Sequence, residues 1–165
     1  TLSSAASDVY KRQKKAMYLT GLNIWPTLKA DIETCRWEFQ ALQYQIDHTE
    51  GCALLMLAIT KRGVRGRIIL DENNFYDSSC ARQAARVEEL WKSDCELHVI
   101  TPPGGNWASM HAKVWIFDKA IYYTGSPNMT HNGMEKNKEC GARIEDEDCV
   151  ADCLLYTSPS PRDPH

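Results

Sequence analysis

Apolar residues recur along this chain at two different periods, and the alternation of these periods predicts its elements. Helical spacing predicts three helices, and short apolar or alternating runs predict the strands between them. The helices are expected at 26–35, 47–62 and about 79–92. The strands are expected at 37–46, 67–70, 96–100, 113–117, 121–124 and 140–144. Because strands alternate with helices, the pattern favours an α/β sandwich.

Local signals refine the ends and faces of these helices. Asp47 is typical of an N-cap, and Glu50 stands three residues later as its capping-box partner. Gly63 is expected to end the same helix. Four residues of the third helix are expected to face inward: Ala84, Val87, Leu90 and Trp91. The segment 101–108 is rich in proline and glycine, which predicts a loop.

The two ends of the chain show neither period. Residues 1–13 and 153–165 resemble translated sequencing-adapter sequence, and we interpret both as non-native tails. Natural disordered tails are the alternative interpretation. The remaining residues, 14–152, have the length of one domain. A leader, a membrane anchor or a second domain of the natural protein could lie beyond these ends.

Composition limits the binding partners and the cellular compartment that are expected for this domain. The net charge is −3, whereas nucleic-acid-binding domains are usually basic, so strong non-specific binding of nucleic acid is disfavoured. The 7 cysteines have irregular spacing, which predicts reduced, mostly buried thiols in an intracellular, reducing compartment. The sequence contains no apolar run long enough to cross a membrane. Mitochondrial or membrane association would require an anchor lost from the N-terminus.

The clearest chemistry lies in one short segment after the predicted loop. Its residues follow the spacing H-x-K-x4-D-x6-G-S-x-N: His111, Lys113, Asp118, Gly125, Ser126 and Asn128. Alternation along a strand places His111 and Lys113 on the same side of the sheet, and 125–128 lies at the end of the neighbouring strand. An imidazole, an ammonium, a hydroxyl and an amide therefore converge. These groups can attack a phosphodiester and hold its charge.

This segment resembles the signature of the phospholipase D superfamily, the HKD motif. The resemblance extends downstream to Asn137-Lys138-Glu139, where the family carries an Asn-x-Glu element. It extends upstream to 61–64 and 67–71, which resemble the family's RGVxVRxxxD segment, although Gly66 replaces an apolar strand residue. In all it covers roughly 37–148. It implies a phospholipase D-like mixed β-sheet flanked by helices on both faces.

The resemblance also implies a role for each residue of the motif. His111 is the expected nucleophile and would form a covalent phospho-histidine. Lys113, Ser126 and Asn128 are expected to stabilise the phosphate oxygens, where negative charge grows during the reaction. These roles require neither a metal nor a cofactor. We therefore expect a metal-independent phosphodiesterase that acts on phospholipid or on nucleic acid.

Four further residues complete the expected site. Gly125 allows the backbone to approach the substrate closely. Glu139 is expected to orient His111 and to stabilise its imidazolium form. Asp118 lies at a turn and is counted with the catalytic set as a support rather than as a reacting group. Trp107 lies in the loop before the histidine, where it either contacts a base or a lipid or anchors the loop itself.

One histidine does not complete the usual mechanism, because the leaving alkoxide needs a proton from a second group. The family takes this proton from a second HKD motif, and the chain contains no second His-x-Lys. We therefore expect a homodimer in which two copies share one site across a two-fold axis. Two alternatives stay open: one half of a two-motif phospholipase D or phosphatidyltransferase, and a non-catalytic phosphate-binding scaffold.

Overall fold

The computed structural model describes residues 15–75, 81–101, 108–148 and 150–151. Both predicted tails, most of the predicted 101–108 loop and Trp107 lie outside the described residues. The strands are β1 (Lys15–Thr20), β2 (Glu38–Gln43), β3 (Arg65–Asp71), β4 (Glu96–Ile100), β5 (Lys113–Phe117), β6 (Ile121–Gly125) and β7 (Cys140–Glu145). The helices are α2 (Gly21–Thr34), α3 (Thr49–Arg62), α4 (Glu72–Phe75), α5 (Ala81–Lys92) and the π-helical turn η3 (Asn132–Lys136).

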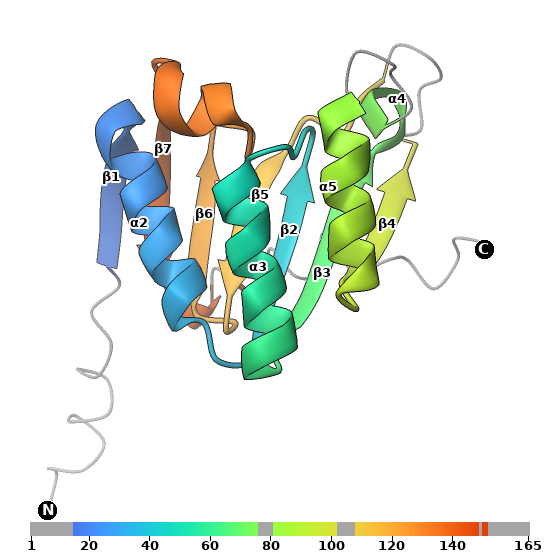
Figure 1. Cartoon of the computed structure of the whole chain (residues 1–165). Coiled ribbons are helices and arrows are strands. Elements are labelled where there is room, and N and C mark those ends of the chain that lie inside the picture. The colour runs from blue at the N-terminus through green and yellow to red at the C-terminus, as the bar shows by residue number, and fades with distance from the viewer. Residues whose placement is uncertain (1–14, 76–80, 102–107, 149, 152–165) are drawn as a thin grey trace, which may run out of the picture.

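The strands of the described chain form one mixed sheet in the order β1-β7-β6-β5-β2-β3-β4. The pairs β2–β3 and β3–β4 are parallel, whereas the other neighbours are antiparallel. Helices make both parallel connections, as a crossover between parallel strands requires. α2, α3 and α5 cover one face of the sheet (Figure 1). The predicted α/β class is confirmed.

Both faces of the sheet are covered, but unequally. On the face that carries the three helices, Trp115 and Phe117 stack with their ring centroids 6.0 Å apart inside the main core. On the opposite face, Val114 and Ile116 pack against Val150, which belongs to the last helical turn of the described chain. Successive side chains of β5 therefore alternate between the two faces, and all of them are buried.

Strand direction brings several strand ends to one edge of the sheet. β2, β3, β4 and β6 end at this edge, whereas β5 and β7 begin there. Lys113 pairs with Gln43 at the end of β2, and Gly125 pairs with Gly141 of β7. We call this edge the site edge, and we call the opposite edge, where β5 turns into β6, the turn edge. Ligands of open α/β sheets bind beyond strand ends of this kind.

The first helix begins earlier than the sequence pattern predicts. α2 starts five residues before Pro26, which lies inside the helix rather than at its first position. At its N-terminus, the side-chain oxygen of Asn23 accepts a hydrogen bond from the Thr20 N–H at 2.7 Å. Burial of Ile24 against the core favours the longer helix, although Pro26 removes one backbone hydrogen bond.

The N-cap of α3 differs from the predicted capping box. His48, not Asp47, is the N-cap, and its Nδ1 atom accepts a hydrogen bond from the Gly51 N–H at 3.1 Å. The Asp47 carboxylate instead accepts the backbone N–H of His131 at 3.2 Å. Glu50 bonds side chains of α2. Both carboxylates are therefore recruited by distant partners that no local pattern reveals.

The inward face of α5 is only partly the one predicted. Val87 and Leu90 are buried, whereas Ala84 is exposed and Trp91 keeps 65% of its surface exposed. Gln83 is buried instead, and its side-chain oxygen accepts a backbone N–H at 2.8 Å from the segment before α3. This long-range hydrogen bond explains why a polar residue can face inward beside Val87 and Leu90.

Three labelled elements, β1, α4 and η3, have no counterpart among those predicted from the sequence. β1 buries only Leu19, so its sequence lacks the alternation of a half-buried strand. It is held by its pairing with β7. The short turn η3 has no apolar period either. By contrast, the predicted end of α3 is confirmed, because Gly63 adopts a left-handed φ of 70° there.

Four cysteines lie in the described part of the chain, and the predicted reducing compartment stays a prediction. Cys35, Cys52 and Cys95 are buried and free, and burial raises the pKa of each to about 12. Cys140 is free and exposed.

Among the helices of the described ranges, none combines the length and the apolar character needed to cross a bilayer.

Candidate active site

Apart from Asp118, the motif residues gather at the site edge. Lys113 is the first residue of β5, His111 lies two residues before it, and Ser126 directly follows β6. β7 begins beside Ser126, whose N–H donates to the Cys140 carbonyl at 2.9 Å. His111 and Ser126 are exposed, whereas Lys113 keeps only 7% of its surface exposed. The structure thus joins an accessible imidazole and an accessible hydroxyl to a buried ammonium.

Lys113 carries its charge without a salt bridge to any residue that the structure describes. Its Nζ atom donates to the carbonyl oxygen of His111 at 2.7 Å and lies 5.2 Å from the centre of the Tyr44 ring. Burial lowers the pKa of Lys113, and the charge of Glu139 acts in the opposite direction. A buried cation in this state gains from an anionic ligand, such as a phosphate oxygen.

Tyr44 belongs to this site, although it lies outside the sequence motif. Its ring centre lies 4.8 Å from that of His111, and the two rings are tilted by 57°. Tyr44 directly follows β2, so it reaches the site edge from the neighbouring strand. An aromatic residue at the end of a predicted strand was the only signal for it. The ring therefore lies beside both the imidazole of His111 and the ammonium of Lys113.

Ser126 and Glu139 form a second part of the site. The Ser126 hydroxyl donates to the Glu139 carboxylate and accepts the Cys140 N–H at 3.1 Å. The side-chain amide of Asn137 donates to the other carboxylate oxygen at 3.1 Å. Within the described chain, Glu139 thus hydrogen-bonds Ser126 and Asn137 rather than His111. Its predicted role in orienting the histidine stays a prediction.

Asn128 is held by its backbone, whereas its side-chain oxygen has no partner in the described part of the chain. The Met129 N–H donates to Oε1 of the buried Gln43 at 3.0 Å, and the Thr130 N–H donates to the Asn128 carbonyl at 2.8 Å. The Oδ1 atom of Asn128 is buried and has no hydrogen-bond partner among the described residues. Such atoms are rare. In the expected role of Asn128, the NH2 group of the same amide is the donor to a phosphate oxygen.

Gly125 is required for the contact between β6 and β7. A Cβ atom at this position would lie 2.5 Å from the Cys140 carbonyl oxygen and 2.6 Å from the Cα atom of Gly141. Any larger residue would push the two strands apart at the site edge. The close approach seen here is thus between strands, and an approach to the substrate stays a prediction.

Asp118 does not lie with the other motif residues. It follows β5 at the turn edge, roughly 16 Å along the strand from Lys113. Its carboxylate accepts the N–H groups of Arg36, Trp37 and Glu38 at 2.9, 2.7 and 3.1 Å. Burial acts to raise its pKa, but these hydrogen bonds outweigh burial and hold the pKa below its usual value. Its place in the catalytic set is corrected: Asp118 fixes the entry to β2.

A buried carboxylate at the end of β3 fixes the segment that precedes His111. Asp71 is fully buried, and its Oδ2 atom accepts the Met110 N–H at 2.6 Å. Nearby, the side-chain amide of Asn73 donates to the Ala108 carbonyl at 3.0 Å. Asp71 ends the segment that resembles the family's RGVxVRxxxD, which was the signal for it. Its hydrogen bond holds the backbone directly before His111.

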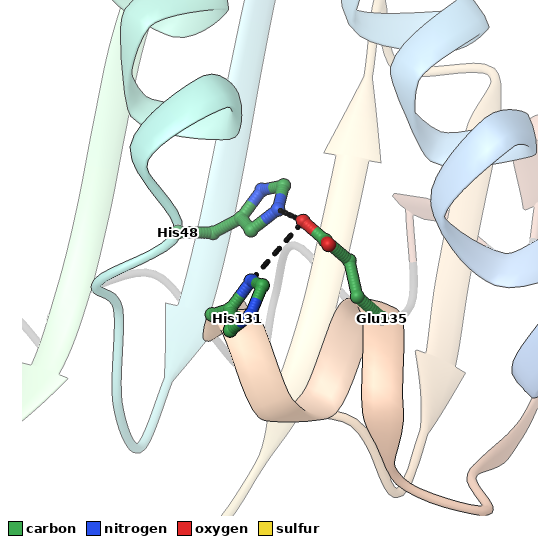
Figure 2. Close-up of side chains that lie close together, drawn as sticks. All are labelled: His48, His131 and Glu135. Carbon is green, nitrogen blue, oxygen red and sulfur yellow. Dashed lines mark hydrogen bonds and ion pairs between the residues drawn. The ribbon is translucent and has the colours of Figure 1, made fainter.

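One group near the site has atoms of the kind that bind metals. Atoms of His48, His131 and Glu135 lie within 4.8 Å of one another (Figure 2). However, His48 Nδ1 accepts the Gly51 N–H, so the neutral ring carries its proton on Nε2. That nitrogen would have to lose its proton, and the helix its cap, before His48 could bind a metal. The donor set therefore fits a hydrogen-bonded group better than a metal centre.

Comparison with known proteins places this fold and site in a family. Residues 28–155 match the family described as "Cardiolipin synthase, PLD-like domain". The matched span includes the whole motif and both strands that carry it. The chain belongs to this PLD-like domain family, within the phospholipase D superfamily.

The curated relatives are larger proteins. The 5'-3' exonuclease PLD3 of Xenopus tropicalis is 30% identical over 99 residues, which are 60% of this chain and 19% of that protein. The 5'-3' exonuclease PLD3 of Rattus norvegicus is 26% identical over 94 residues, which are 57% of this chain and 18% of that protein. The chain thus spans about a fifth of the curated relatives it matches.

Two solved structures have the same fold over nearly their whole length. NucT from Helicobacter pylori is 20% identical with a TM-score of 0.76, and the match covers 87% of this chain and 93% of that one. The phospholipase D family member Nuc from Salmonella typhimurium gives the same identity and TM-score, and the match covers 87% and 91%. The predicted phospholipase D-like fold is confirmed.

Proposed function

We propose that this chain is the catalytic domain of a metal-independent phosphodiesterase. The observation that carries the proposal is the exposed imidazole of His111 beside the buried, unneutralised ammonium of Lys113. A ring nitrogen of His111 attacks phosphorus, a P–N bond forms, and the bond from phosphorus to the leaving oxygen breaks. A second acid protonates that oxygen. Water then cleaves the P–N bond, which releases a phosphomonoester and restores the histidine.

We propose nucleic acid as the first substrate class. The similarity to the 5'-3' exonucleases supports it, and the stacking surface of Tyr44 beside His111 suits a base next to the scissile phosphate. Phospholipid is the second candidate, because the matched family is described as a cardiolipin synthase domain. The net charge of −3 implies that the substrate is held locally, near Lys113, rather than by a broad basic surface.

A panel of four substrates tests this function. Purified protein in excess chelator is given single-stranded DNA, RNA, cardiolipin or phosphatidylcholine. Cleavage of either polynucleotide, with both lipids intact, supports the first candidate, and the reverse supports the second. Binding without cleavage of any substrate would favour a non-catalytic scaffold.

We propose that the second acid is the His111 of another copy of this chain. The single motif supports this arrangement, because two copies on a two-fold axis place one histidine on each side of the phosphate. The alternative is a second motif in a longer natural protein, which the short coverage of the relatives supports. If the site is shared, mixing wild-type protein with His111→Ala lowers total activity more steeply than dilution does. A linear fall, or an active monomer by light scattering, contradicts the shared site.

A further inference from the structure

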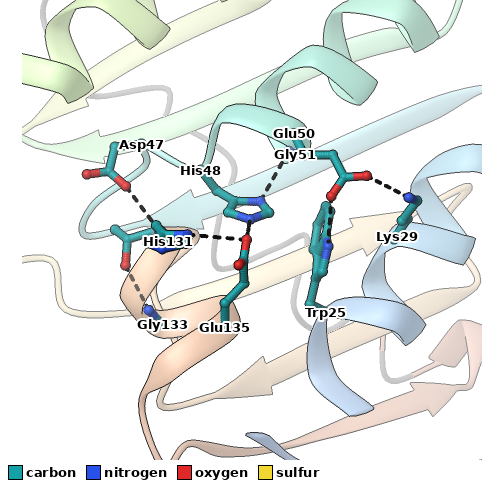
Figure 3. Close-up of polar contacts among 10 residues, drawn as sticks. Trp25, Lys29, Asp47, His48, Glu50, Gly51, His131, Gly133 and Glu135 are labelled. Carbon is teal, nitrogen blue, oxygen red and sulfur yellow. Dashed lines mark hydrogen bonds and ion pairs between the residues drawn. The ribbon is translucent and has the colours of Figure 1, made fainter. Parts of the chain in front are cut away.

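Glu135 in the η3 turn joins two segments that are far apart in the sequence. Its Oε1 atom lies 2.8 Å from His48 Nε2 at the start of α3 and 3.3 Å from His131 Nδ1. We call these three residues the histidine clasp (Figure 3). The side chain of His48 is only 2% exposed, whereas that of Glu135 is 42% exposed. The clasp thus ties a surface turn to a buried helix end.

The two segments that the clasp joins also hold the backbone around Asn128. The Met129 carbonyl accepts the N–H groups of Asp47 and His48, both at 3.0 Å. The η3 turn packs directly on Asn128, because a side chain at Gly133 would collide with the Asn128 carbonyl oxygen. Displacement of η3 from α3 would therefore move Asn128.

We propose that Glu135 is a positioning residue for Asn128, acting through His48 and His131; this inference rests on the phosphodiesterase function proposed above. The Oδ1 atom of Asn128 has no hydrogen-bond partner among the described residues, so the position of the amide depends on its backbone. Glu135 contacts no reacting group. It sets the distance from which Asn128 donates to the phosphate, and catalysis is sensitive to such distances.

The clasp works as a hydrogen-bonded unit. Because His48 Nδ1 accepts the Gly51 N–H, the Nε2–H group is the donor to Glu135. This hydrogen bond is the main cause that lowers the pKa of Glu135, and the charge of His131 adds to it. An acceptor oxygen at position 135 is thus the feature that holds the two segments together, and glutamine provides one as well.

Kinetics of three variants test the proposal. Glu135→Ala should lower kcat about tenfold and leave KM within about twofold, because a shift of about 1 Å in a positioned group costs up to about a hundredfold. Glu135→Gln should restore kcat to within about threefold of wild type, because it keeps the acceptor for His48. Glu88→Ala, which removes an exposed glutamate of α5, is the matched control. An unchanged kcat in Glu135→Ala, or an equal loss in Glu135→Gln, overturns the proposal.

A second measurement does not depend on turnover. Amide hydrogen exchange at Met129 and Thr130 should accelerate in Glu135→Ala and stay near the wild-type rate in Glu135→Gln and Glu88→Ala. If exchange at these amides is the same in all variants, the clasp does not hold Asn128 and the proposal fails. If the wild-type protein cleaves no diester, the proposed function fails, and hydrogen exchange still decides whether Glu135 positions Asn128.

Discussion

Two charged residues of the same motif lie at opposite ends of β5, Asp118 directly after its end and Lys113 at its start. The surroundings of the two charges differ in how far they stabilise them. At the turn edge, the Asp118 carboxylate accepts three backbone N–H groups from residues 36–38. At the site edge, Lys113 is more deeply buried, yet its hydrogen bond within the described chain is to one carbonyl, that of His111. The fold satisfies the first charge and leaves the second largely unsatisfied.

The pKa values of Asp118 and Lys113 shift in ways that reflect this difference. For Asp118, burial acts to raise the pKa, but the backbone hydrogen bonds prevail and lower it, so the fold stabilises the charged form. For Lys113, burial prevails and lowers the pKa, so the fold destabilises the charged form. A charge that the chain satisfies by itself supports the fold, whereas a charge left unsatisfied is available to a substrate.

The largest expected effect lies at the site edge, in His111→Ala. Loss of a covalent nucleophile should lower kcat/KM by at least about a thousandfold. The thermal unfolding midpoint should stay near that of wild type, because the ring is exposed. His98→Ala removes a histidine of β4 whose side chain is 42% exposed, and it serves as the control. Activity of His111→Ala within about tenfold of wild type would contradict the assignment.

The Lys113→Met variant is expected to lower activity while it raises the stability of the fold. The variant should lower kcat about a hundredfold, because it removes charge stabilisation at the phosphate. It should also raise the free energy of unfolding: the folded pKa lies below the unfolded value, so the charged lysine destabilises the fold at neutral pH, and methionine removes this cost. Hydrolysis rates and urea denaturation measure the two effects. Lys92→Met, an exposed site on α5, is the control. A marked loss of stability in Lys113→Met would break the comparison.

Asp118→Ala should show the opposite pattern. The free energy of unfolding should fall by about 2–3 kcal/mol, since three backbone N–H groups lose a charged acceptor. The kcat of the folded fraction should stay within about threefold of wild type, because the residue is distant from the site edge. Asp118→Asn keeps one acceptor oxygen and should lose less stability. A selective loss of kcat in a stable Asp118→Ala protein would return this residue to the catalytic group.

The sequence was sufficient for the part of the site that lies on one continuous segment. The motif spacing and strand alternation place His111 and Lys113 together, and the structure agrees. Tyr44 reaches the same place only because β2 pairs with β5, and this register is a tertiary property. Asp118 shows that closeness in the sequence can also mislead. It lies five residues from Lys113, yet the extended strand β5 places it at the opposite edge of the sheet.

Long-range hydrogen bonds explain most of the other errors. Asp47 has the local features of an N-cap, but the His131 N–H recruits its carboxylate. Gln83 faces inward because its side chain satisfies a buried backbone N–H. The local preference of a residue is overridden where its side chain is needed to satisfy a buried polar group elsewhere in the chain. The elements that carry the motif were therefore predictable to within a few residues, whereas β1, α4, η3 and the polar contacts that fix the site were not.

The stability of the fold in acid gives a smaller effect, which tests directly whether the charge of Asp118 stabilises the protein. The folded pKa of Asp118 is lowered, so its stabilisation is fully present above the unfolded pKa and is lost as the pH falls through the folded value. The difference in unfolding free energy between wild type and Asp118→Asn should thus be constant near neutral pH and shrink below about pH 4. Urea denaturation from pH 7 to pH 3 measures it. A difference that persists in acid would show that the charge of Asp118 contributes little.

The smallest expected effect is that of a chelator. Activity should be unchanged in excess EDTA, because Lys113, Ser126 and Asn128 provide the charge stabilisation that a cation would otherwise supply. This outcome would support a site in which side chains, and not a chelatable metal, stabilise the charge of the phosphate. Loss of activity in EDTA with rescue by zinc would break the comparison, because the decisive charge would then be a metal. If His131→Ala abolished that rescue, the histidine clasp would be the metal site, and its hydrogen-bonded role would be wrong as well.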